Sequence, residues 1–324
     1  MHQYDIRDLR IHFPTRRGVV EAVRGVSFYM DQGECVALVG ESGCGKSVTA
    51  RSLMGLTEVT GGRCQPGSQI LCHGENILDY SKKQWQSYRG REAAMIFQDA
   101  MTSLNPTMQI GHQIAECYRF HQKIGRKEAL EKAAEMLALV GISDPETALR
   151  RYPHEFSGGM RQRVMIASAL ACQPELLIAD EPTTALDVTI QAQILHLMQD
   201  LIKDFDTSIL FITHDLGVVA EMADRVVVMY TGQIVEEADV YTLFHNPKHP
   251  YTQGLLNSTI NVQQQDDTLE PIAGTVPSLN HLPEGCRFHP RCKYATEACK
   301  HTMPQLVEVG PGHYSRCLLA EKEG

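Results

Sequence analysis

Alternating apolar and polar residues at the start of the chain predict strands, because a strand that is buried on one face has a period of two. The alternation runs from Tyr4 to Phe13, breaks at residues 15–18 and resumes from Val19 to Met30, which predicts an antiparallel hairpin or meander. The continuous apolar run Cys35–Val39 is typical of a strand buried on both faces. A glycine-rich turn follows it, and then a predicted helix from about Lys46 to Leu56.

Further along the chain, helical periods alternate with short apolar runs. Residues Ile110 to Val140 have a helical period, whereas Leu176–Ala179 and Ser208–Thr213 are strand-sized runs with a helix between them. Val226–Met229 and Gln233–Glu236 flank a short turn and predict a second hairpin.

The pattern changes after His245, where prolines interrupt a polar stretch. We interpret this stretch as a linker region that leads to a small cysteine-containing tail, and we find no internal repeat. The prolines are Pro247, Pro250, Pro271, Pro277 and Pro283.

Composition narrows the function classes. A chain of 324 residues with 43% hydrophobic residues is neither a disulfide-stapled mini-protein nor mainly disordered. Its 30 Lys and Arg against 39 Asp and Glu give a net charge of −9, a poor basis for wrapping nucleic acid. No apolar run reaches the roughly 18–20 residues that span a bilayer, and the start of the chain lacks a signal pattern. We therefore expect a cytosolic chain that reaches a membrane only through a partner.

One segment, which we call the phosphate loop, fits the pattern G-x-x-x-x-G-K-S/T between a buried strand and a helix. Its glycines let successive N–H groups face an anion, its lysine would reach β- and γ-phosphates, and its serine would bind Mg²⁺. The alternative is a glycine-rich turn that only caps a helix. The residues are Gly40, Glu41, Ser42, Gly43, Cys44, Gly45, Lys46 and Ser47.

Two further segments carry chemistry that suits a phosphate site. The strand Leu176–Ala179 ends in Asp180, which can hold magnesium through water, and Glu181, which can polarise an attacking water. A strand that ends in two carboxylates is usually structural, but beside a phosphate loop it becomes the second half of one site. Ser157, Gly158 and Gly159 precede a helical run and offer N–H donors to phosphate oxygens.

Together, these spaced elements give residues from about 5 to 257 a resemblance to the ATP-binding-cassette (ABC) ATPase family. The resemblance implies an α/β P-loop NTPase cassette over residues 1–257, with a mixed sheet core, an antiparallel β subdomain and an α-helical subdomain at about 100–155. Residues 258–324 would form a small cysteine-containing extension. Ser157-Gly158-Gly159 resembles the family signature, although Met160 replaces the usual glutamine. This departure does not affect the expected nucleotide binding.

The resemblance also implies roles for single residues. ATP would be bound by Phe13 stacked on adenine, by the phosphate loop with Val48 after it, and by Asp180. The alternative interpretation of Phe13 is a core residue of the first hairpin. The implied catalytic residues are Glu181, Gln98, which would contact Mg²⁺ together with Ser47, and His214, which would contact the γ-phosphate.

The implied assembly is a sandwich of two cassettes, head to tail, around two ATP molecules. Ser157, Gly158 and Gly159 would complete the partner's site, and Asp187, in the segment Ala185-Leu186-Asp187, would communicate across the dimer. ATP binding would close the sandwich and hydrolysis reopen it, moving a membrane partner. The implied partners are a sister cassette subunit, two permease subunits and an extracytoplasmic substrate-binding protein, with this chain peripheral on the cytoplasmic face and no nucleic acid.

The end of the chain bears on the transported solute. His245–Leu256 resembles the segment after the cassette in ATPases of oligopeptide, dipeptide and nickel importers, and Gly285–Cys292 is similar to their C-terminal extension. The resemblance implies a peptide importer, with nickel or another small solute as the alternative. The other functions that we keep open are a soluble cassette ATPase acting on nucleic acid or ribosomes and a metal-responsive regulatory ATPase.

Four cysteines of the tail form a candidate metal site: Cys286, Cys292, Cys299 and Cys317, with 5, 6 and 17 residues between them. Four thiols in a short segment suit a four-thiolate centre. The absence of Cys-x-x-Cys pairs argues against a zinc ribbon. The resemblance implies a four-iron–four-sulfur (4Fe–4S) cluster, with zinc or free structural thiols as alternatives.

Overall fold

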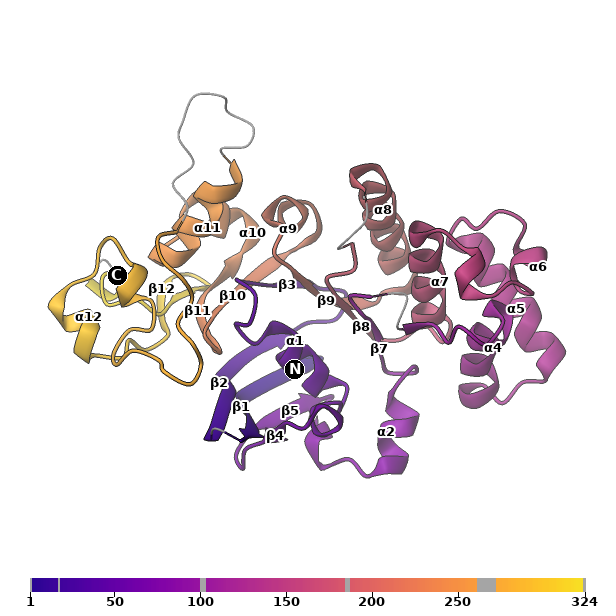
Figure 1. Cartoon of the computed structure of the whole chain (residues 1–324), viewed down its shortest axis with the longest axis horizontal. Helices are drawn as coiled ribbons and strands as arrows, with labels where there is room; N and C mark the ends of the chain where they lie inside the picture. The colour runs from indigo at the N-terminus through magenta and orange to yellow at the C-terminus, as the bar shows by residue number, and fades with distance from the viewer. Residues whose placement is uncertain (1, 17, 100–102, 184–186, 261–271, 323–324) are drawn as a thin grey trace. The chain divides into compact units, whose positions relative to one another are not determined.

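The computed structural model describes residues 2–16, 18–99, 103–183, 187–260 and 272–322. The chain forms two compact units (Figure 1). The first unit combines Met1–Asp79 with Phe211–Gly324, and the second is Tyr80–Leu210. These units follow the contacts within the chain, and the domain boundaries predicted from the sequence stay predictions.

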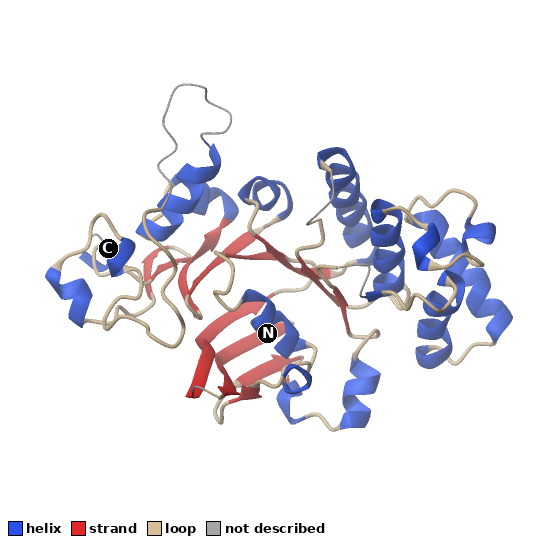
Figure 2. Cartoon of the chain, in the orientation of Figure 1, coloured by secondary structure: helices blue, strands red, loops and turns tan. Residues whose placement is uncertain are grey.

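The first unit begins with the predicted antiparallel hairpin. β1 pairs with β2 from Tyr4↔Met30 to Thr15↔Gly18, and their sheet has the order β2-β1-β5-β6 with β4 also beside β1. Figure 2 shows these strands in red. The bounds are β1 (Tyr4–Thr15), β2 (Gly18–Met30), β4 (Arg63–Cys64), β5 (Gln69–Cys72) and β6 (Glu75–Asn76).

The other strands of the first unit form a mixed sheet. β3 is parallel to β10, and both are buried along their whole length, as predicted for strands covered on two faces. β11 is antiparallel to β10 and completes the second predicted hairpin. The C-terminal tail then adds β13 beside β11, with Glu236 opposite Ser315, and β12 beside β13. The bounds are β3 (Cys35–Val39), β10 (Arg225–Tyr230), β11 (Gln233–Asp239), β12 (Val307–Gly310) and β13 (His313–Ser315).

The helices of the first unit include one where the sequence predicted a linker. Pro250 begins α11, because proline at a first helical position loses no hydrogen bond. Tyr251 and Leu256 of α11 are buried, so this part of the predicted linker belongs to the folded core. The bounds are α1 (Lys46–Leu53), α9 (Leu216–Met222), α10 (Val240–His245), α11 (Pro250–Ile260) and α12 (Glu297–His301), with single 3-10 turns at Glu58–Thr60, Ile77–Asp79, His289–Arg291 and Ala320–Lys322.

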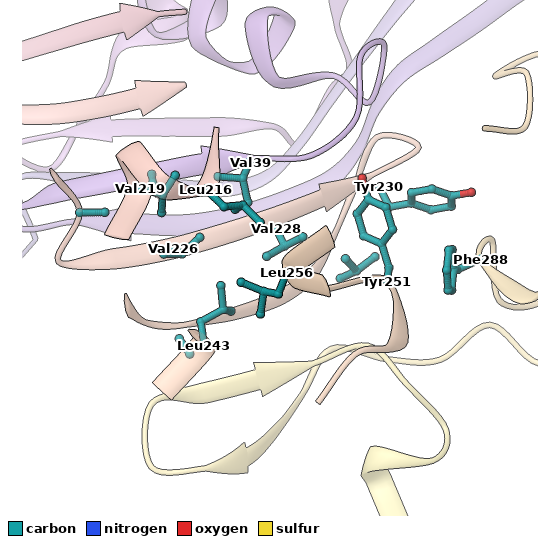
Figure 3. Packing of buried hydrophobic residues seen from close by; sticks show 14 residues of the cluster. Val39, Leu216, Val219, Val226, Val228, Tyr230, Leu243, Tyr251, Leu256 and Phe288 are labelled. Carbon is teal, nitrogen blue, oxygen red and sulfur yellow. The ribbon is translucent and has the colours of Figure 1, made fainter. Parts of the chain in front are cut away.

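A hydrophobic cluster joins the C-terminal tail to the mixed sheet (Figure 3). Phe288 of the tail is 4% exposed, and its ring centroid lies 5.4 Å from that of Tyr230 and 5.4 Å from that of Tyr251. Tyr230 and Tyr251 are themselves 4.7 Å apart. Aromatic pairs at such distances add to the free energy gained by burial, so the tail is part of the core of this unit.

The second unit is mainly helical. β7 and β8 are parallel, with Ile96 opposite Ala179, and helices α4 and α5 confirm the helical period predicted for this part of the chain. β9 (Ser208–Thr213) runs from this unit into the first. The other bounds are α2 (Lys82–Tyr88), β7 (Ala93–Ile96), α4 (Ile110–His121), α5 (Arg126–Leu139), α6 (Pro145–Ala148), a 3-10 turn at Pro153–Glu155, α7 (Gly158–Leu170), β8 (Leu176–Asp180) and α8 (Val188–Phe205).

Candidate functional site

The phosphate loop leaves β3 and enters α1, and its backbone requires glycine at two positions. Gly40 has φ +148°, and a Cβ there would lie 2.2 Å from the carbonyl oxygen of Met229. Gly45 has φ +104°, and a Cβ there would lie 2.7 Å from the carbonyl oxygen of Ala22. Only glycine avoids both the strain and the clash, so the loop lies close against the backbone of β10 and of β2.

The candidate phosphate-binding lysine lies folded back onto the loop. Lys46 is 6% exposed, and its Nζ donates to the carbonyl oxygens of Gly40 at 2.7 Å and Glu41 at 3.2 Å. A buried ammonium needs such partners, and phosphate oxygens are stronger ones than neutral carbonyls. Cys44 is buried beside it, and burial raises the pKa of this thiol, which therefore stays protonated.

The rest of the loop is open toward solvent. Ser42 and Gly43 are exposed, and a Cβ on Gly43 would meet no atom within 4 Å. Ser47 and Val48 are half-buried in the first turn of α1. The helix N-terminus and the open loop together provide backbone donors for an anion.

In the second unit, Gln98 and Glu181 come together. Each follows the carboxyl end of one of the paired parallel strands β7 and β8, and Gln98 Nε2 donates to Glu181 Oε2 at 2.8 Å. Glu181 has φ +50°, an unusual value for a residue with a side chain. Backbone strain of this kind often occurs at functional positions. Asp180, at the end of β8, is 3% exposed.

The predicted signature segment caps α7. Ser157 Oγ accepts from the backbone N–H of Met160 at 3.4 Å, Gly158 faces open space, and a Cβ on Gly159 would lie 2.8 Å from Ile190. The open position at Gly158 leaves room for a ligand next to the N-terminus of the helix.

The structure adds one residue that the sequence analysis missed. Gln162 of α7 is 4% exposed, and its Nε2 donates to the carbonyl oxygen of Pro182 at 2.5 Å. This bond ties the signature helix to the segment directly after Glu181. The sequence signal for this role was a glutamine among the apolar residues of α7, because a buried polar side chain needs a hydrogen-bond partner.

The remaining candidates lie on other elements of the two units. Phe13 is half-buried on β1 opposite Val20, and His214 is exposed directly after β9. Asp187 caps α8, because its Oδ1 accepts from the N–H of Ile190 at 2.9 Å. Ala185 and Leu186 lie outside the described residues. The phosphate loop, Phe13 and His214 thus belong to the first unit, and the other candidates belong to the second.

The four tail cysteines lie in one region, and their thiols influence one another. Burial first, and the neighbouring thiols to a smaller extent, raise the pKa of Cys286 to about 11. The pKa values of Cys292 and Cys317 are raised for the same reasons. Four thiols are suitable donors for zinc or an iron–sulfur cluster. Within the described residues, however, no three Cys, His, Asp or Glu side chains form a group arranged to hold a metal ion.

The described part of the chain also contains no helix with the length and apolar character needed to cross a membrane.

Comparisons with known families match two regions of the chain. The model of the ABC transporter family matches residues 23–184, and that of the oligopeptide/dipeptide transporter C-terminal region matches residues 235–299. The oligopeptide transport ATP-binding protein AppD of Bacillus subtilis (strain 168) is 51% identical, over 99% of this chain and 97% of its own length. The dipeptide transport ATP-binding protein DppD of Lactococcus lactis subsp. cremoris (strain MG1363) is 49% identical, over 98% of this chain and 90% of its own length.

Solved structures share the fold. The dimeric ATP-binding cassette MJ0796 bound to ADP and Pi has a TM-score of 0.65 at 22% identity, covering 73% of this chain and 98% of its own. CbiO1 from Clostridium perfringens has a TM-score of 0.63 at 24% identity, covering 81% and 96%. These likenesses confirm the predicted fold class, an α/β P-loop NTPase cassette.

Proposed function

Because this chain belongs to the ABC transporter family of ATP-binding proteins, we propose that it hydrolyses ATP to power a membrane importer of dipeptides and oligopeptides. One observation carries the choice of peptides: residues 235–299, most of which follow the cassette motifs, match the C-terminal region of oligopeptide/dipeptide transporters. Relatives named for peptide transport are also about half identical over nearly the whole chain.

At the ATP site, we assign the phosphates to the phosphate loop and the N-terminus of α1. Lys46 exchanges its two carbonyl partners for β- and γ-phosphate oxygens, which are charged and therefore stronger acceptors. We assign Phe13 to the adenine ring. Ser47 and Gln98 are the proposed ligands of Mg²⁺, with Asp180 acting through water. Bound Mg²⁺ neutralises charge on the phosphates.

For hydrolysis, we assign the general base to Glu181. Its contact with Gln98 at 2.8 Å supports this role, because the amide fixes the orientation of the carboxylate that would polarise the attacking water. His214 is the proposed contact of the γ-phosphate.

The proposed assembly includes a second cassette, a sister chain, whose ATP is contacted by Ser157, Gly158 and Gly159. The open space at Gly158 supports this, since a phosphate can approach the backbone there. Asp187 belongs to the same interface. Two membrane permeases and an extracytoplasmic substrate-binding protein complete the importer, and the chain lies peripherally on the cytoplasmic face. Nucleic acid has no part in this function.

The test of the cargo is uptake by intact cells that carry either the natural chain or Glu181→Gln in place of the chromosomal copy. Labelled dipeptides and oligopeptides are supplied beside labelled nickel. We expect peptide uptake to stop in the variant while nickel uptake is unchanged. Loss of nickel uptake alone would show that a metal ion is the cargo, and unchanged uptake of both would contradict the importer.

For the tail, we propose that Cys286, Cys292, Cys299 and Cys317 hold a metal centre, a 4Fe–4S cluster or else zinc. The donor chemistry of four thiols in one short segment supports this assignment. Anaerobically purified protein is expected to show a broad visible absorbance that Cys292→Ser abolishes. Cys64→Ser, which alters a half-buried cysteine far away in the sequence, is the control. A colourless protein that contains zinc would exclude the cluster, and one without metal would exclude the centre.

A further inference from the structure

An arginine of the C-terminal tail binds a glutamate of the phosphate loop. The guanidinium of Arg291 donates to Glu41 through both terminal nitrogens, Nη1 to Oε2 at 2.6 Å and Nη2 to Oε1 at 3.0 Å. The side chain of Arg291 is 4% exposed and that of Glu41 is 30% exposed. Arg291 Nε donates to the carbonyl oxygen of Ala273, and this bond fixes the plane of the guanidinium. A planar, two-bond arrangement of this kind fixes the carboxylate in position and orientation.

The backbone of Glu41 is held as well. Its N–H donates to the Tyr251 hydroxyl at 2.8 Å, and its carbonyl oxygen accepts from Lys46. Tyr251 is fully buried and packs against both Tyr230 and Phe288, so its hydroxyl has little freedom. Two of the three groups that fix Glu41 therefore come from the part of the chain after the cassette motifs.

Contacts other than the Arg291–Glu41 pair also dock the tail. β13 pairs with β11, and Phe288 is buried in the aromatic cluster. Glu236 is fully buried between His313 Nε2, at 2.8 Å, and the backbone N–H of His249, at 3.0 Å. With these contacts in place, the bond from Arg291 to Glu41 has its main effect on the phosphate loop.

We infer that Arg291 is a positioning residue for ATP binding, which acts through Glu41 to fix the first turn of the phosphate loop. The conformation of this turn determines the positions of Lys46 and of the backbone N–H donors after it. A loop that is ordered before the ligand binds also loses less entropy on binding. The C-terminal tail thereby takes part in nucleotide affinity. The inference rests on ATP binding at the loop and does not depend on which solute is carried.

The test measures equilibrium binding of a fluorescent ATP analogue to the purified full chain. We expect Arg291→Ala to weaken binding about tenfold, because an ordered charge-assisted pair is lost. Arg291→Lys keeps the charge and one bond, and is expected to recover most of the affinity. Glu41→Ala is expected to weaken binding as much as Arg291→Ala, and the double variant no further, because both changes remove the same interaction.

Two controls make the result decisive. Arg287→Ala removes an arginine of the same segment whose guanidinium donates to the carbonyl oxygen of Pro283, and it is expected to bind ATP as the natural chain does. Lys46→Ala tests the ATP site itself: if it binds normally, the site assignment fails. If Lys46→Ala loses binding while Arg291→Ala stays within twofold of the natural chain, or if the effects of Arg291→Ala and Glu41→Ala multiply, only the role of Arg291 is overturned.

Discussion

Lys46→Ala is expected to weaken ATP binding by at least about a hundredfold. Each hydrogen bond to a charged group contributes about 1.5–3 kcal/mol, and the variant loses the bonds from the ammonium to the β- and γ-phosphates. The ammonium is buried and already aligned along the loop, with its Nζ on the carbonyl oxygens of Gly40 and Glu41. Alanine leaves the glycine positions unchanged, so the loop can keep its path while losing its only side-chain cation. Equilibrium binding of a fluorescent ATP analogue to the full chain measures the effect.

The control for this variant is Lys127→Ala, which removes a lysine whose side chain is 94% exposed on α5. It is expected to bind ATP as the natural chain does. Binding by Lys46→Ala within threefold of the control would contradict the phosphate-loop assignment.

Glu181→Gln is expected to lower the rate of ATP hydrolysis by about 10²- to 10⁴-fold, the range that a general base contributes. ATP affinity should be retained, because glutamine has nearly the same shape and its side-chain oxygen can still accept from Gln98 Nε2. The variant should therefore accumulate as an ATP-loaded complex. Single-turnover hydrolysis measures the rate, and gel filtration with ATP detects the trapped complex.

Glu131→Gln, on the exposed surface of α5, makes the same chemical change away from the candidate site. Its hydrolysis rate is expected to equal that of the natural chain. A similar rate in Glu181→Gln would exclude this residue as the base and direct attention to the other catalytic candidates.

Much of the fold could be predicted from hydrophobic periods. Strands β1, β2, β3 and β10 follow runs of period two or continuous apolar runs, which local sequence reveals. Helix α11 could not be predicted in this way, because Pro250 and the nearby polar residues have the local composition of a linker. Only the tertiary structure shows that Tyr251 and Leu256 are buried in the core. The short strands β12 and β13 depend on pairing with β11, which a local pattern does not contain.

The candidate site could be predicted where polar side chains directly follow the end of a buried strand. Gln98 and Glu181 follow neighbouring parallel strands, so their contact is a consequence of the fold. By contrast, Glu41 and Arg291 are 250 residues apart in sequence, and neither residue type indicates its partner. The spacing of the four cysteines likewise gives their number and order but not the directions in which their thiols point.

The pairing of β13 with β11 has a consequence for which strand forms the outer edge of the mixed sheet. An uncovered edge strand presents a row of free N–H and C=O groups, to which a strand of another copy can attach. In this chain, the tail covers part of that edge with its own backbone and places the two-residue turn between β12 and β13 beyond it. The tail thus moves the outer edge of the sheet from β11 to β12, a strand of only four residues that offers another chain few backbone groups to pair with.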